Sequence, residues 1–423
     1  MTKLRGKLYS LAPWAAGVLI GFMGMPAGAV DLKSSDGNWT FSINGNVNVH
    51  YIYSKCEDSP APTVAGGLAC TGTASGSNVS HIQNGLLPAA FSFGVATTQD
   101  GIDLAAHLGL YPGIAANDTG SPNIGPLVNP RNGNTGLATT GLDIRQVYLT
   151  FGNKELGTFK LGRDIGLFGA DVILNDMTLP GVGGAGSAAS TAPANTTLGG
   201  IGLGYIYTDW LAQIDYTTPD FSGLNFTIGI FDPINSLLHG DTVAPKKAPG
   251  FHGKVAWTMP ISNTTKFYGS ATFISQKQDY IGGAGPYSWD GTGFDVFAKI
   301  DVEDFEAFAY YYHGSGLGTT ALFFLADDGL GNKRDSDGFL VQATYKVGAV
   351  KFGVNYGESK LDLANAADST TLVSKNRKIT GGVYYSLTKN LTLLGEISDV
   401  QADAHNGNKN KGTNGNVGAF LSF

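Results

Sequence analysis

The stretch NWTFSINGNVNVHYIY, residues 38–53, alternates between apolar and polar side chains. Every second residue from Trp39 is apolar, aromatic or glycine, and the residues between them are polar apart from Ile52. Strict alternation of this kind predicts a β-strand with one apolar face and one polar face. The run is far longer than the usual strand of about five or six residues. The fold therefore depends on whether the apolar face of such strands contacts a protein core or lipid.

The same pattern recurs along the whole chain. Seven predicted hairpins follow the opening strand, and a last strand, NVGAFLSF (416–423), closes the chain, which makes sixteen predicted strands. The hairpins span residues 91–111, 143–163, 205–231, 251–275, 294–312, 339–357 and 378–398. The turns inside the hairpins are short, whereas the links between successive hairpins are long.

An even number of alternating strands with short turns on one side and long loops on the other is typical of an outer-membrane barrel. After Ala29 no second apolar run is long enough for a transmembrane helix, and a closed barrel is the other structure that satisfies every backbone group in lipid. Aromatic residues near strand ends, Tyr51, Tyr53 and 310–312, are interpreted as interfacial girdle residues. The alternative is a soluble secreted sandwich or β-helix. We expect an all-β, sixteen-stranded antiparallel transmembrane barrel whose apolar face meets lipid.

The N-terminal residues predict a secretory signal peptide over 1–29. Lys3, Arg5 and Lys7 precede a long uncharged run that ends in the cleavage-site pattern Ala27-Gly28-Ala29. The alternative is an uncleaved membrane anchor. Removing three positive charges changes the formal net charge from −7 to −10 for the expected barrel, 30–423. This acidic balance argues against nucleic acid as a partner.

Cysteine usage predicts one local disulfide. Cys56 and Cys70 are the only two cysteines, and both lie in one loop-like segment. In a secreted chain this spacing favours a disulfide, which is worth about 3 kcal/mol for a loop of this length. The alternative is two free thiols. A metal site is not expected, because no second cysteine pair or nearby histidine accompanies them.

Several short motifs resemble the general porins of Gram-negative outer membranes. They are GTFKLGRD (157–164), LNDMTLPGVGG (174–184), YTTPDFSGLNF (216–226), YYSLTKNLT (384–392) and the terminal GAFLSF (418–423). The resemblance covers the whole predicted barrel and implies a homotrimer of sixteen-stranded channels in the outer membrane of a Gram-negative bacterium. It also implies that the third long loop folds into the lumen.

The resemblance places a constriction loop at 164–200. Asp176 stands at the position of an acidic constriction residue, and Arg145 and Arg163 stand where the family carries inward-facing arginines. Asp164 and Asp171 are further candidates. Opposed charges at a constriction favour one sign of permeant ion. The alternative interpretation of Asp176 is a solvated residue that caps the loop.

We expect passive diffusion of small hydrophilic solutes and ions, with a weak preference for cations. The predicted barrel carries 24 Lys and Arg, after removal of three from 27, against 34 Asp and Glu. Two departures from the family pattern indicate a weakly charged constriction: Gly181 and Val182 follow Pro180, and Asp209 occupies a strand that often carries an arginine. The alternatives are a solute-specific channel and a barrel that sheathes a periplasmic partner such as an electron carrier.

No enzyme activity and no cofactor are expected. His313 and Ser315 have a spacing seen in an outer-membrane phospholipase, but no residue that could orient the histidine is evident. GVGGAG (181–186) matches a dinucleotide-binding pattern but follows no βαβ unit, so its glycines are expected to serve loop folding.

Overall fold

The structure is a computed structural model of the 423-residue chain, and it describes residues 30–57, 61–70, 78–114, 142–184, 196–235, 242–244, 246–282 and 285–423. The predicted signal peptide, 1–29, lies outside the described residues. So do residues 185–195 of the predicted constriction loop. Among the described residues, no helix is long and apolar enough to cross a membrane.

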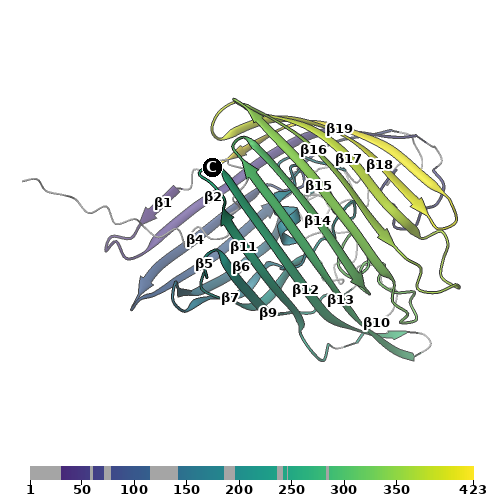
Figure 1. Cartoon of the computed structure of the whole chain (residues 1–423), viewed down its shortest axis with the longest axis horizontal. Coiled ribbons are helices and arrows are strands. Elements are labelled where there is room, and N and C mark those ends of the chain that lie inside the picture. The colour runs from purple at the N-terminus through teal and green to yellow at the C-terminus, as the bar shows by residue number, and fades with distance from the viewer. Residues whose placement is uncertain are drawn as a thin grey trace, which may run out of the picture.

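Sixteen antiparallel strands form a closed ring within the described part of the chain, as predicted. Each pairs with the next, and β19 pairs with β2 to close the barrel (Figure 1). Their bounds are Thr40–Cys56 (β2), Ala90–Gln99 (β4), Ile102–Pro112 (β5), Leu142–Asn153 (β6), Gly157–Ile165 (β7), Trp210–Thr217 (β8), Leu224–Phe231 (β9), Gly250–Pro260 (β11), Thr265–Gly282 (β12), Gly285–Val302 (β13), Phe305–Ser315 (β14), Asp335–Val347 (β15), Val350–Leu361 (β16), Val373–Ser386 (β17), Leu391–Ala404 (β18) and Lys409–Ser422 (β19).

Three short strands extend this ring without closing it. Val30–Lys33 (β1) and Asn78–Gln83 (β3) pair with β2, and Thr242–Val243 (β10) pairs with β12. At the closing seam, the backbone of Phe423 exchanges two hydrogen bonds with Gly45, of 2.8 and 3.0 Å. The last residue is therefore part of the closure.

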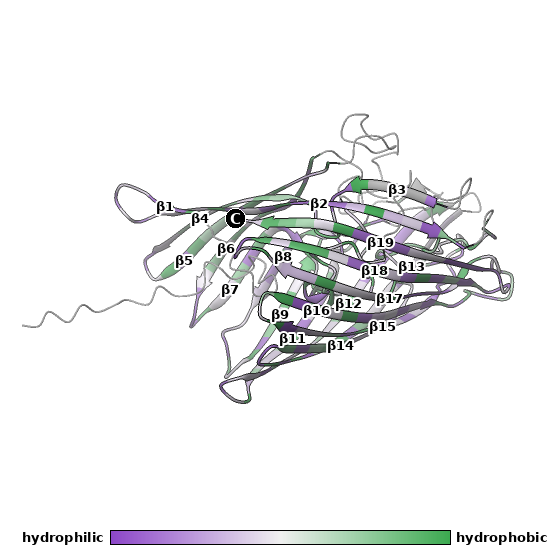
Figure 2. Cartoon of the chain, turned by 90° about the horizontal axis from the view of Figure 1, so that it is seen from above, coloured by the Kyte–Doolittle hydropathy of each residue, from purple (hydrophilic) through white to green (hydrophobic). Residues whose placement is uncertain are grey.

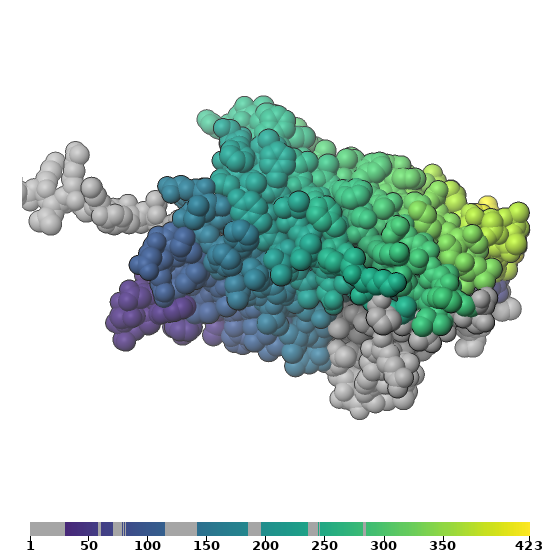
Figure 3. Space-filling model, turned by 90° about the horizontal axis from the view of Figure 1, so that it is seen from below, coloured from purple at the N-terminus to yellow at the C-terminus, as the bar shows by residue number. Residues whose placement is uncertain are grey.

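The opening strand has the two faces that its alternation predicts. Val47, Val49 and Tyr51 are exposed on the outside, whereas Asn48 and His50 are buried on the inside. Figure 2 shows hydrophobic segments along the strands of the barrel, and Figure 3 shows the packed side chains of one outer face. The apolar face thus forms the outer surface of a closed barrel, and the soluble alternative is excluded.

Two details of the strands differ from the sequence predictions. Tyr310 and Tyr312 are buried on the inner face of β14, and only Tyr311 is exposed on the outer face. A girdle position for all three was therefore wrong, because adjacent residues of a strand point to opposite faces. The strand predicted from Tyr205 begins only at Trp210. Asp209 has a φ of 69°, which is incompatible with an extended strand.

Candidate functional site: the third loop and the channel wall

The connection between β7 and β8, residues 166–209, is named the third loop. It carries the one-and-a-half-turn helix Ala170–Asn175 (α1) and contacts the inner wall from β11 to β18. Asp171 of α1 accepts hydrogen bonds from Lys254 Nζ of β11, at 2.7 Å, and from the Tyr268 hydroxyl of β12, at 3.0 Å. The predicted constriction carboxylate Asp171 is therefore held against the wall by a cation.

The end of α1 is fixed by side chains of β13 and β15. Lys299 Nζ donates to Asn175 Oδ1 at 3.2 Å, and Gln342 Nε2 donates to the Asn175 carbonyl at 2.9 Å. The backbone N–H of Met177 donates back to Gln342 Oε1 at 2.7 Å. The loop backbone is thus bonded to the barrel and lies inside it, as the family resemblance implied.

Asp176 is fully buried between the loop and the wall, with an exposed fraction of 0%. Its carboxylate accepts hydrogen bonds from the Thr178 N–H, at 2.9 Å, the Tyr205 hydroxyl, at 2.9 Å, and Asn355 Nδ2, at 3.1 Å. In this arrangement Asp176 neither faces permeants nor is solvated. It joins two parts of the third loop to β16.

Glu396 of β18 is an anchor that the sequence analysis did not single out. Its carboxylate accepts hydrogen bonds from the backbone N–H groups of Val182 and Gly183, at 2.8 and 2.9 Å. It also accepts from the Tyr384 hydroxyl at 2.6 Å. A Cβ at Gly181 would lie 2.0 Å from Glu396 Oε1, so the glycine allows the loop backbone to approach this carboxylate. The available signal was a carboxylate on the polar face of an alternating strand.

Arg145 faces the inside because of a β-bulge. Gln146 lies opposite Gly109 and Ile144 lies opposite Leu110, so Arg145 is the extra residue between them. A bulge changes the direction of a side chain. Arg145 Nε donates a hydrogen bond of 2.8 Å to Asp143 Oδ2. The central carbon of the guanidinium group lies 5.2 Å from the ring centroid of Tyr111. Arg145 therefore faces inward and is charge-paired on its own strand, and its role at the constriction stays a prediction.

Asp164 and Arg163 are neighbours in β7, so their side chains leave the backbone on opposite faces of the strand. Asp164 is buried and accepts hydrogen bonds from Gln146 Nε2, at 2.9 Å, and Lys160 Nζ, at 2.7 Å. Arg163 lies in register with Val147 and Ala212, which are both exposed on the outer face. Residues in one register row share a face. The backbone of β7 thus starts Arg163 on the outer face, but its Nε is buried and its charge acts on Asp143 of the inner face, so its place at the constriction stays a prediction.

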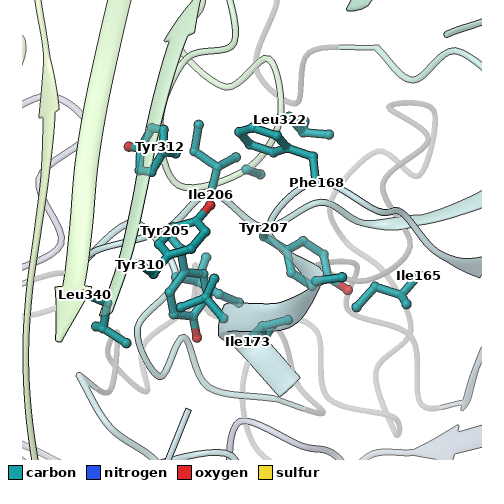
Figure 4. Close-up of a cluster of buried hydrophobic side chains, with 14 of the residues drawn as sticks. Ile165, Phe168, Ile173, Tyr205, Ile206, Tyr207, Tyr310, Tyr312, Leu322 and Leu340 are labelled. Carbon is teal, nitrogen blue, oxygen red and sulfur yellow. The ribbon is translucent and has the colours of Figure 1, made fainter. Parts of the chain in front are cut away.

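Apolar side chains of two loops pack together inside the barrel. In Figure 4, Tyr205, Ile206 and Tyr207 of the third loop gather with Phe168 and with Leu322 of the 316–334 loop. The two loops also exchange backbone hydrogen bonds: the Tyr207 N–H donates to the Thr320 carbonyl, and the Leu322 N–H donates to the Tyr207 carbonyl. Part of the lumen is thus filled by a shared hydrophobic core.

Further contacts hold the loops at this end of the barrel. Arg334 forms two hydrogen bonds to Asp368, of 2.7 and 2.8 Å, and this contact holds the pKa of the Asp368 carboxyl well below its usual range. Cys56 and Cys70 form a disulfide with a Cα–Cα distance of 5.0 Å, which ties the end of β2 to the first loop. In the described residues no group of three or more His, Cys, Asp or Glu could hold a metal ion.

His313 gives no support for a catalytic site. Its ring lies beside the exposed Phe294 on the outer face, with ring centroids 6.1 Å apart. This position faces the lipid-exposed side of β14.

The described geometry resembles that of known outer-membrane channels. The structure matches the outer membrane channel DcaP of Acinetobacter baumannii, with a TM-score of 0.64 and 15% identity over 93% of this chain and 99% of that one. It matches OmpF of Salmonella typhi in complex with daunomycin, with a TM-score of 0.58 and 16% identity over 93% and 100%. The anion-selective porin of Comamonas acidovorans gives a TM-score of 0.57 and 14% identity over 91% and 100%.

At these identities the structural matches establish the fold alone. No curated protein matched the sequence significantly. The family model described as Gram-negative porin, however, matches residues 15–405, which is most of the chain. The chain therefore belongs to the Gram-negative porin family and is a non-enzymatic channel of the outer membrane that allows passive diffusion.

Proposed function

We propose that this porin passes small hydrophilic solutes and ions with a weak preference for cations, and that it assembles as a homotrimer. The observation that carries the selectivity is the charge on the inner face of β5–β8. In these four described strands that face holds four carboxylates, Asp103, Asp143, Asp164 and Asp215, against Arg145 and Lys160, and a third cation, Arg163, acts on Asp143 although its backbone starts from the outer face. A channel wall of negative balance attracts cations.

The preference is expected to be weak because most of these charges are neutralised locally. Asp143 forms a salt bridge with Arg145, and Asp164 forms one with Lys160. Two strands beyond β8, on β11, Lys254 forms a salt bridge with Asp171 of the third loop in the same way. Paired charges of opposite sign leave little net field beyond a Debye length of about 8 Å.

The reversal potential of the purified protein in a planar bilayer tests this proposal. Under a potassium chloride gradient we expect a potential on the cation side. A potential on the anion side would overturn the proposed selectivity and leave the channel function intact.

Electrophoresis without heating tests the proposed homotrimer and should show a species well above the monomer mass. Migration of the folded protein at monomer mass would count against the trimer.

A solute-specific channel is the second candidate, favoured by an aromatic stack. The ring centroid of Trp289 lies 5.3 Å from that of Tyr280 and 6.3 Å from that of Tyr287. Lys246 Nζ lies 5.5 Å from the centroid of the Tyr280 ring. Such rings can hold flat or cationic solutes. Tyr280 is fully buried, however, and Trp289 nearly so, so the described stack offers little free surface. Saturable block of the current by one class of solute would favour this candidate.

A further inference from the structure

The outer face of β16 and β17 carries three cations near the strand ends that lead to the loops. Ser359 and Asn376 are buried on the inner face, so their strand neighbours Lys360, Lys375 and Arg377 start from the outer face. The side chains of Lys360 and Lys375 are 47% and 30% exposed. These three cations, named the basic cluster, therefore lie on the outside of the barrel.

Two of the three cations face each other directly. Lys360 lies opposite Lys375 in the register of β16 and β17, and like charges in this position destabilise a sheet. One carboxylate, Glu358, is shared between them, with one oxygen 3.7 Å from each ammonium nitrogen. Arg377 lies opposite Glu358, but its guanidinium donates a hydrogen bond of 2.5 Å to Gln401.

The flanking carboxylates add only loose contacts. Asp337 Oδ2 lies 3.7 Å from Lys360 Nζ, which is longer than a hydrogen bond. Asp403 lies opposite Lys375, but it accepts a hydrogen bond of 2.8 Å from Gln401, and Lys409 Nζ lies 3.8 Å from it. Exposed ion pairs of this kind contribute little, so the cations remain able to bind another anion.

The basic cluster lies at the height of the lipid headgroups. Lys375 is ten residues along β17 from Tyr385, an exposed aromatic residue at the short-turn end, and the exposed Ile379 and Val383 between them are apolar. At about 3.3 Å per residue and a strand tilt of about 40°, this separation spans about 25 Å along the membrane normal. The apolar band of an outer-membrane barrel has about this height. The cluster therefore begins where the band ends, on the side of the long loops.

We propose that Lys360, Lys375 and Arg377 bind a phosphate group of a lipid headgroup in the outer leaflet of the membrane. Ammonium and guanidinium groups donate charge-assisted hydrogen bonds to phosphate oxygens, and the phosphate compensates the two opposed lysines. The apolar side chains next to the cluster, such as Ile379, offer a surface to the acyl chains of the same lipid. The inference goes beyond the channel function, because it concerns the outer surface of the barrel.

Other described strands offer different surfaces at their loop ends. The outer residues there on β6, Leu142 and Ile144, are exposed and apolar. Lys277 of β12 is an exposed cation of the outer face, but it lies directly opposite a carboxylate, Asp290, instead of a second cation. Lys277→Gln therefore provides a matched control, because it removes one outer positive charge away from the basic cluster.

The test measures binding of a diphosphorylated glycolipid, lipid A, to the folded protein in an uncharged detergent by microscale thermophoresis. Wild type should bind it saturably, and added salt should weaken the binding. Arg377→Gln and Lys375→Gln should each weaken binding by about fivefold, the effect of one cation near an anionic lipid surface. Glu358→Gln should strengthen binding, because it removes the carboxylate that competes for both lysines. Lys277→Gln should leave binding within about twofold of wild type.

Two further ligands distinguish the possible sources of the phosphate. Lipid A without its phosphate groups should bind wild type much more weakly, and inorganic phosphate should not displace lipid A at similar concentrations. Equal binding of the dephosphorylated lipid, or equal losses for Lys277→Gln and Arg377→Gln, would overturn the inference. Displacement by inorganic phosphate would assign the cluster to free phosphate and overturn the proposed lipid. If heat-modified electrophoresis shows that a variant does not fold, the two ligand comparisons on wild type decide the question.

Discussion

Replacing Glu396 by alanine is expected to release the third loop from β18 and to destabilise the barrel by about 3–5 kcal/mol. The substitution leaves the buried N–H groups of Val182 and Gly183 without the carboxylate that accepts from both. It also leaves the buried ammonium of Lys378, on which the Glu396 charge acts, without this compensation. Urea unfolding in lipid vesicles measures the loss, and single-channel recording should show additional current levels as the loop moves.

Glu396→Gln is the matched control for this prediction. The amide oxygen can still accept from the loop backbone, so a much smaller loss of stability is expected. If Glu396→Ala unfolds at the same urea concentration as wild type and gives one steady current level, the loop is not held by this carboxylate.

Alanine at Gly357 should cost about 1–3 kcal/mol of stability, because β16 and the third loop touch backbone to backbone at this position. A Cβ at Gly357 would lie 2.0 Å from the carbonyl oxygen of Leu203 and 2.6 Å from Leu340 Cδ1. A backbone carbonyl cannot move aside as a flexible side chain can, so the loop segment must shift. Urea unfolding and the single-channel current both report the shift.

Gly381 of β17 provides the comparison, since a Cβ there meets nothing within 4 Å. Gly381→Ala should therefore leave stability within about 0.5 kcal/mol of wild type. Equal effects of the two substitutions would mean that the loop does not pack against Gly357 in the membrane.

The barrel could be predicted from the sequence because its signal is local and repeated. The alternation that starts at Trp39 recurs through every hairpin, and it fixes which face of each strand is apolar. The predicted hairpin 91–111 and the closing strand 416–423 both appear in the structure. Period-two patterning carries this information without any knowledge of distant contacts.

The internal site could be predicted only in outline, because it depends on contacts between distant parts of the chain. The burial of Asp176 follows from Tyr205 and Asn355, which are far from it in sequence. The inward direction of Arg145 follows from a bulge that alternation cannot show, and the start of Arg163 on the outer face follows from its register with Val147 and Ala212. Which carboxylate meets the permeant ion thus depends on pairing within the folded barrel.

The current through the purified protein in a planar bilayer tests passive diffusion most directly. Passive diffusion predicts discrete steps of open current that grow in proportion to the potassium chloride concentration and are not blocked by small neutral solutes. Folded protein that gives no steps, or a current that saturates at low concentrations of one solute class, would contradict it.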